Sequence, residues 1–135
     1  MTTPTDFTLP RTGEQPVTFT GTLLAAETGA MPKLKQHHEI SVYRTQGGSY
    51  VVAISYRTTW KTESPHDLAI VCKTLEQVAE ELWAYDPVES VAGPPEGTLN
   101  WEQRQQETRA AVSERYDTLV SRLLARLPGA AERIE

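Results

Sequence analysis

Residues 39–60 decide the fold, and they read EISVYRTQGGSYVVAISYRTTW. Two runs of β-branched and aromatic residues, the types that favour strands, flank the pair Gly47 and Gly48. Glycine adopts the positive φ angles of a tight hairpin turn without steric cost. The stretch therefore predicts a β-hairpin in which these two glycines form a two-residue turn and Tyr43 lies opposite Val52.

This register assigns each hairpin side chain to one of two faces, because successive side chains of a strand point to opposite sides. The predicted core face carries Tyr43, Tyr50, Val52, Ile54 and Tyr56. The second face carries Ile40, Val42, Val51 and Ala53, together with Arg44 and Arg57. A solvated face of an antiparallel sheet normally alternates to polar residues, so this partly apolar second face is expected to be covered by a helix or a partner.

Segments on both sides of the hairpin extend the sheet and add helices. Residues 17–24 alternate Val17, Phe19 and Leu23 and predict a strand, with Gly21 on the same face as a bulge or close approach. The apolar run in residues 66–73 predicts a fourth strand. Residues 74–85 and 100–127 predict helices. Each of these two segments begins with a possible N-cap residue and has a glutamine three residues later.

The predicted architecture is a single α+β domain over residues 17–127. It has a four-stranded antiparallel sheet (17–73) around the central Gly-Gly hairpin, followed by two C-terminal helices (74–85 and 100–127). A Pro/Gly-rich linker (86–99) separates the helices. Residues 1–16, rich in Thr and Pro, are predicted to form a flexible arm, and residues 128–135 a tail.

Composition narrows the classes of function. The chain has 13 basic and 18 acidic residues and a formal net charge of −5, which argues against bulk binding to a phosphate backbone. Its single cysteine, Cys72, lies in an apolar run and is expected to be a small buried side chain. No secretory signal and no apolar run of about 20 residues occur, so we expect a cytoplasmic protein. No cofactor is predicted.

Three short motifs resemble the EXLDI family of small bacterial proteins. They are FTGTLLA beginning at Phe19, VYRT beginning at Val42 before the glycine turn, and TLEQV beginning at Thr74. The resemblance covers residues 19–82. The Glu-x-Leu-Asp-Ile ending that names the family has no counterpart in this chain. The family has no assigned activity, so the resemblance implies only the order of sheet and helix.

Histidines provide the candidate metal ligands. His37, His38 and Glu39 are adjacent, and His66 and Asp67 precede the fourth strand. These side chains would form a metal site if the two segments met at one sheet edge, because such a site needs three or four convergent ligands. The alternative interpretation is that they are polar residues at strand ends. No Ser-His-Asp order and no phosphate-binding glycine loop occurs in the sequence.

Two other interpretations remain. Arg44 and Arg57, with the hairpin aromatics, would suit an RNA-binding sheet, although the acidity of the chain argues against it. The interpretation that we favour is a non-enzymatic binding or regulatory module, dimeric and acting through protein–protein contacts. The predicted partner-binding residues lie on the second hairpin face and on the apolar stripe of the last helix, which packs either on its own sheet or on a second copy. They are Ile40, Val42, Val51, Ala53, Val112, Tyr116, Leu119 and Leu123.

Overall fold

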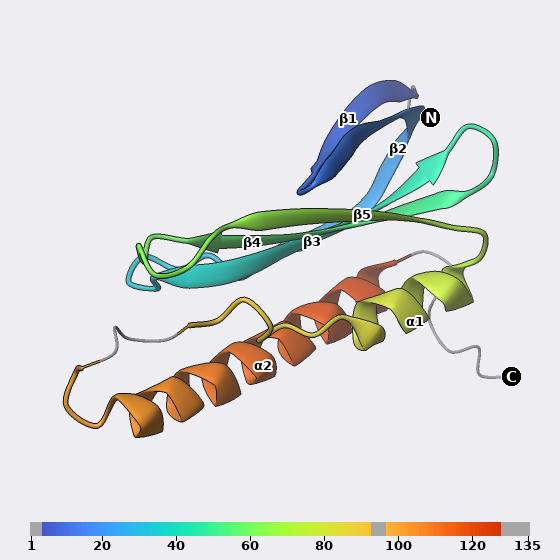
Figure 1. Cartoon of the computed structure of the whole chain (residues 1–135). Helices are drawn as coiled ribbons and strands as arrows, with labels where there is room; N and C mark the ends of the chain where they lie inside the picture. Colours follow the sequence, from blue (N-terminus) through green and yellow to red (C-terminus); the bar gives the residue numbers. More distant parts are fainter. Residues whose placement is uncertain (1–3, 93–96, 128–135) are drawn as a thin grey trace, which may run out of the picture.

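A computed structural model describes residues 4–92 and 97–127 of the chain. The described residues form an antiparallel sheet in the order β1-β2-β3-β4-β5 with two helices on one face, which confirms the α+β class (Figure 1). The sheet has five strands where the sequence predicted four. The elements are β1 (Thr5–Arg11), β2 (Glu14–Thr28), β3 (Gln36–Thr45), β4 (Tyr50–Thr58), β5 (His66–Cys72), α1 (Leu75–Ala84) and α2 (Trp101–Arg126).

The additional strand comes from the segment predicted to be a flexible arm. Residues 5–11 form β1, and residues 14–16 begin β2. Phe7 pairs with Phe19 across the ladder and Leu9 pairs with Val17, so large apolar side chains alternate with Thr as a strand requires. Gly13 has a φ of 80° and allows the tight turn between the two strands. The prediction of a flexible arm is therefore wrong for residues 5–11 and 14–16, which are strands.

The central hairpin is confirmed, but its register is shifted by one residue. Arg44 pairs with Tyr50, and the amide of Thr45 donates to the carbonyl of Ser49 at 2.8 Å. Three residues, 46–48, therefore form the loop in place of the predicted two-residue turn. The amide of Gly48 donates to the carbonyl of Thr45 at 3.0 Å, and Gly48 has a φ of 91°. A type I turn followed by a residue in the left-handed region is the usual geometry of a three-residue hairpin loop.

Relative to the prediction, the shift exchanges the two faces of β3, because a one-residue slip moves every side chain of a strand to the opposite side of the sheet. Ile40 and Val42 lie opposite Ile54 and Val52 and face the helices with them. Tyr43, which was predicted for the core face, lies on the opposite face. We call the sheet face that packs on the helices the inner face and the opposite one the outer face.

Both predicted helices form, with boundaries within one residue of those expected. Thr74 caps α1, since its hydroxyl accepts from the amide of Gln77 at 3.1 Å, while the side chain of Gln77 accepts from the amide of Lys73. Asn100 precedes α2 with a left-handed φ of 58° and makes no side-chain cap bond, so the second predicted cap is not realised. No described helix is long and apolar enough to cross a bilayer.

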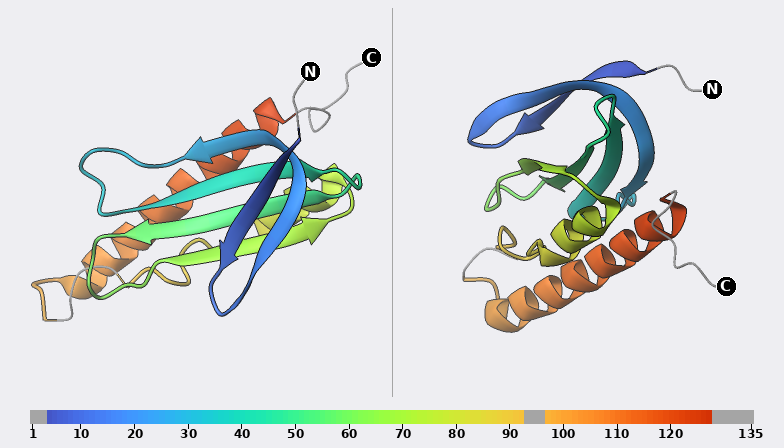
Figure 2. Two further views of the ribbon diagram at one scale, coloured as in Figure 1. Left: turned by 90° about the horizontal axis from the view of Figure 1, so that it is seen from above. Right: turned by 90° about the vertical axis from the view of Figure 1, so that its right-hand side faces the viewer.

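The core lies between the inner face and the two helices. The predicted stripe of α2 is buried against the sheet of the same chain, and Cys72 is buried beside it as expected. Figure 2 shows α2 running diagonally under the strands, with α1 beside it. The α2 residues buried there are Val112, Tyr116, Leu119, Val120 and Leu123. The predicted tail, residues 128–135, and residues 93–96 of the linker lie outside the described part of the chain.

The β1–β2 hairpin bends away from the helices and over the outer face, so the sheet curls into a half-barrel (Figure 2). Its tip is fixed on β5. The amide of Thr12 donates to the carbonyl of Asp67 at 2.9 Å, and the amide of Asp67 donates to the hydroxyl of Thr12 at 2.8 Å. Both faces of the central strands are therefore partly covered.

Replacing Leu123 by Ala tests the role of α2 in the core. Leu123 is fully buried, so Leu123→Ala should lower the free energy of unfolding by about 2–5 kcal/mol through lost burial and the cavity left behind. Urea denaturation measures the change. Gln106→Ala, at an exposed position of the same helix, should leave stability nearly unchanged. A Leu123→Ala protein as stable as the Gln106→Ala control would show that α2 does not pack on the sheet.

Candidate functional site

A chain of hydrogen bonds links two histidines at one end of the inner face. His38 on β3, Tyr56 on β4 and His66 on β5 lie side by side in the sheet register. The hydroxyl of Tyr85, just after α1, lies 2.7 Å from Nε2 of His66 and 3.3 Å from Nε2 of His38. Nδ1 of His66 lies 3.2 Å from the hydroxyl of Ser90. The sheet thus presents two imidazoles to one phenol.

The phenol of Tyr85 determines which of the two imidazoles donates a hydrogen bond and which accepts one. Its single O–H donates to one imidazole only, so the other imidazole must donate to the phenol oxygen. Burial lowers the pKa of His38 to about 4, with smaller contributions from the charges of His66, His37 and Arg115. Burial also lowers the pKa of His66, and burial raises the pKa of Tyr85. All three groups are therefore neutral near pH 7.

Glu63 forms a second buried polar centre next to the histidines. It is 8% exposed and accepts hydrogen bonds from the hydroxyls of Tyr56 at 2.6 Å and Thr58 at 2.8 Å. Its other oxygen accepts from the amide of Ala92 at 2.8 Å. Burial, followed by the hydrogen bond to Glu63, raises the pKa of Tyr56. This carboxylate ties the β4–β5 loop and the linker after α1 to the end of the sheet.

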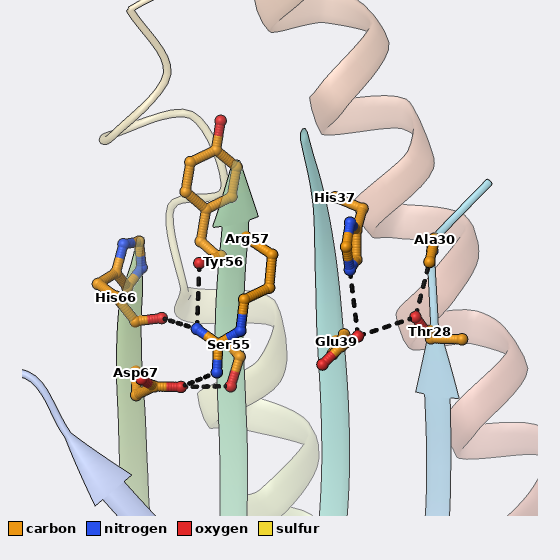
Figure 3. A network of polar contacts seen from close by, with 9 residues as sticks. All are labelled: Thr28, Ala30, His37, Glu39, Ser55, Tyr56, Arg57, His66 and Asp67. Atoms are coloured by element: carbon orange, nitrogen blue, oxygen red, sulfur yellow. Dashed lines mark hydrogen bonds and ion pairs between the residues drawn. The ribbon is translucent and has the colours of Figure 1, made fainter. Parts of the chain in front are cut away.

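The structure brings His38 and His66 to one phenol, but it does not bring His37, Glu39 and Asp67 to the same point. His37 lies on the outer face, where its Nε2 is 3.1 Å from Oε2 of Glu39 (Figure 3). His38, the next residue along β3, faces the helices, and its ring centre lies 5.2 Å from that of Tyr116. Asp67 accepts from Arg57 at 2.7 Å and from Ser55 at 2.8 Å. Burial alone would raise the pKa of Asp67. The hydrogen bonds from Arg57 and Ser55 outweigh this effect and hold the pKa below its usual value. Within residues 4–92 and 97–127, no group of three potential ligands could hold a metal ion.

The two arginines of the nucleic-acid interpretation lie on opposite faces of the sheet. Arg44 shares the inner face with Tyr50, and its guanidinium lies 5.8 Å from the centre of that ring. Arg57 lies on the outer face in an ion pair with Asp67. A stacking platform needs its basic and aromatic side chains on one open face, and these two arginines are not placed that way.

The predicted partner-binding residues are largely covered by the chain itself. Seven of the eight are buried and Ala53 is half-buried. The four on α2 pack toward the inner face of the same chain, so a second copy could receive them only if α2 were exchanged between chains. Their role in partner binding stays a prediction. Those buried are Ile40, Val42, Val51, Val112, Tyr116, Leu119 and Leu123.

Two of the exposed large apolar side chains, Leu23 and Val71, lie at the two ends of one row across the outer face, while Met31, Trp83 and Leu99 are exposed elsewhere. The register places Leu23, Tyr43, Val51 and Val71 opposite one another on β2 to β5. Leu23 is 46% and Val71 57% exposed, while Val51 between them is 1% exposed. We call these four residues the outer row.

An aromatic cluster adjoins the outer row. The ring centres of Phe7 and Phe19 on the overlying hairpin lie 4.8 Å and 5.4 Å from that of Tyr43. The two phenylalanine rings are 5.5 Å apart. These contacts fix the β1–β2 hairpin above one end of the row and leave its two outer side chains uncovered.

Comparisons with protein-family models, curated proteins and solved structures found no match to this chain. The resemblance to the EXLDI family therefore stays a prediction. Sequence reasoning also missed Tyr85, Ser90 and Glu63. No local sequence pattern indicates a role for these three residues. Each lies in a loop, and only the packing of the sheet and helices brings them to the end of the sheet that carries the histidines.

The pKa of His38 predicts a specific loss of stability in acid. Its folded pKa of about 4 lies below the 6.5 of an unfolded histidine, so between these pH values only the unfolded chain takes up the proton. The free energy of unfolding should fall as pH falls through this window, by about 3 kcal/mol from His38. Urea denaturation at stepped pH should show a weaker decline for His38→Gln, whereas His37→Gln should follow the wild type. Parallel curves for wild type and His38→Gln would contradict this assignment.

Proposed function

We propose that this chain is a small, non-enzymatic, cytoplasmic binding module that acts through a protein–protein contact of its outer sheet face, with a second copy as its partner. The supporting observation is the outer row. Leu23 and Val71 are about half exposed, although the aliphatic side chains of the neighbouring inner face are buried. Exposed aliphatic side chains gathered in one row are typical of a contact surface.

The arrangement of the row suits a symmetric contact. Val71 lies on β5, which is an edge strand of the sheet, and Leu23 lies on β2 at the other side of the row. An edge strand offers unpaired backbone groups to a neighbouring strand, so apolar and backbone contacts are available together. A two-fold dimer uses the same patch twice, and each exposed side chain of the row would be covered by the partner.

Solution mass measured by light scattering across a range of concentrations tests this proposal. The wild type should be dimeric at high concentration. A variant carrying Leu23→Lys and Val71→Lys should be shifted toward monomer, with Kd raised by more than about tenfold, because burying each aliphatic side chain contributes about 1.5–3 kcal/mol.

The matched control adds the same charge elsewhere. Gln106→Lys together with Ser121→Lys places two lysines at exposed positions of α2, and this variant should dimerise like the wild type. A wild type that is monomeric at every concentration, or two double variants with equal effects, would overturn the proposal of self-association.

The alternative function is a metal-binding protein or metal-dependent enzyme that uses His37, His38 and His66. One observation favours it: His38 and His66 meet at one phenol oxygen beside a cleft of about 410 Å³ that includes His66 and Ser90. Our expectation is less than one bound metal per chain in protein purified without a histidine tag, unchanged by His66→Ala. A stoichiometric metal that is lost in His66→Ala would establish the alternative.

A further inference from the structure

Two adjoining spaces lie between the β2–β3 connection and α2, away from the outer row. The inner one is a cavity of about 10 Å³, which is room for a single water-sized group. The outer one is a cleft of about 430 Å³ that opens to solvent. Gly29, Arg115 and Leu119 line both spaces, so the cavity forms the inner end of the cleft.

A buried hydrogen-bond donor at the inner end lacks an acceptor. Gln36 lines the cavity and is 4% exposed. Its Nε2 has no hydrogen-bond partner among the described residues, and it is the one buried side-chain polar atom of which this is true. Buried amides are nearly always satisfied, so an unpaired donor that lines a cavity indicates that something else supplies the acceptor.

A cation at the junction of the two spaces also lacks a partner. Arg115 is half-buried and makes no hydrogen bond or ion pair with any described residue. By contrast, Arg57 is paired with Asp67, and Arg109 donates to the carbonyl of Val91. The planar guanidinium matches the two oxygens of a carboxylate, and an ion pair formed away from water is stronger than one at an open surface.

The rest of the cleft fits an anion with an apolar body. Arg122 and Arg115 line it together with one acidic residue, Glu114. Met31, on the β2–β3 connection, and Leu119, on α2, give it apolar walls. The inner cavity admits one oxygen atom of such an anion, and the rest of its head group then lies beside Arg115 at the junction with the cleft. The planar guanidinium matches the two oxygens of a carboxylate, and the apolar walls suit the organic body that inorganic phosphate lacks.

We propose that this cleft binds a small organic acid. One carboxylate oxygen accepts from Nε2 of Gln36 in the inner cavity, the guanidinium of Arg115 holds the carboxylate, and the apolar body lies against Met31 and Leu119. The site is independent of the outer row, so it holds or fails separately from the proposed dimer contact.

Benzoate, hexanoate, acetate and inorganic phosphate, at matched ionic strength, are the probes. Two-dimensional amide NMR of the full chain follows the backbone signal of Gly29 and the side-chain signal of Gln36 during titration up to about 10 mM, which covers weak small-ligand affinities. Benzoate and hexanoate should shift both signals in a saturable way. Acetate should bind more weakly, since it lacks the apolar body.

Two variants and one control locate the site. Arg115→Gln should weaken benzoate binding by about tenfold or more, because the ion pair is lost. Gln36→Leu should weaken binding while leaving the chain at least as stable, since it removes a donor that the free protein does not satisfy. Arg104→Gln removes the same charge at an exposed position of α2 outside the cleft and should bind like the wild type.

Three results would overturn the proposal. The first is the absence of a saturable shift with either benzoate or hexanoate. The second is equal weakening by Arg115→Gln and Arg104→Gln, which would indicate a general effect of charge. The third is phosphate binding as tightly as benzoate with the same response to Arg115→Gln, which would make the site one for inorganic anions.

Discussion

The fold depends on a close approach of two backbones at Gly21. This residue pairs with Thr5 of β1 and with Thr45 of β3, so β2 changes ladders there. A β carbon at position 21 would collide with the carbonyl oxygen of Arg44, and only glycine allows this approach. Because the crossing is possible, the first half of β2 can leave the sheet plane and carry β1 over the outer face.

The bend is followed by a bulge that determines which side chains remain exposed. The pairing of β2 with β3 shifts between Leu23 and Ala25, so one extra residue, Leu24, lies in β2. Leu23 therefore faces outward beside Tyr43, whereas Ala25 faces inward and is buried. Without the bulge, the strand's alternation would place both residues on one face. The exposed leucine of the outer row is thus a consequence of backbone irregularity in β2.

Local patterns predicted the elements, and long-range contacts account for what they missed. The hairpin strands, the Thr74 cap and the α2 stripe each depend on neighbours within one element, and the sequence shows them directly. The hairpin register depended on the loop geometry at Gly48, which the letters of a Gly-Gly pair do not specify. β1 was missed because Thr and Pro residues conceal the alternation of Phe7 and Leu9. The bond between His38 and Tyr85 joins residues 47 positions apart, and no local pattern encodes it.

The polar end of the sheet also determines how α2 is placed. Within the Pro/Gly-rich linker before α2, Val91 is buried and its carbonyl accepts from Arg109 of α2. The next carbonyl, of Ala92, accepts from Gln105, while the amide of Ala92 donates to Glu63. These bonds, together with the apolar core, hold α2 against the sheet. Held in this orientation, α2 lines the same cavity with Arg115 that β3 lines with Gln36, which makes the buried carboxylate of Glu63 a distant support of the proposed acid-binding cleft.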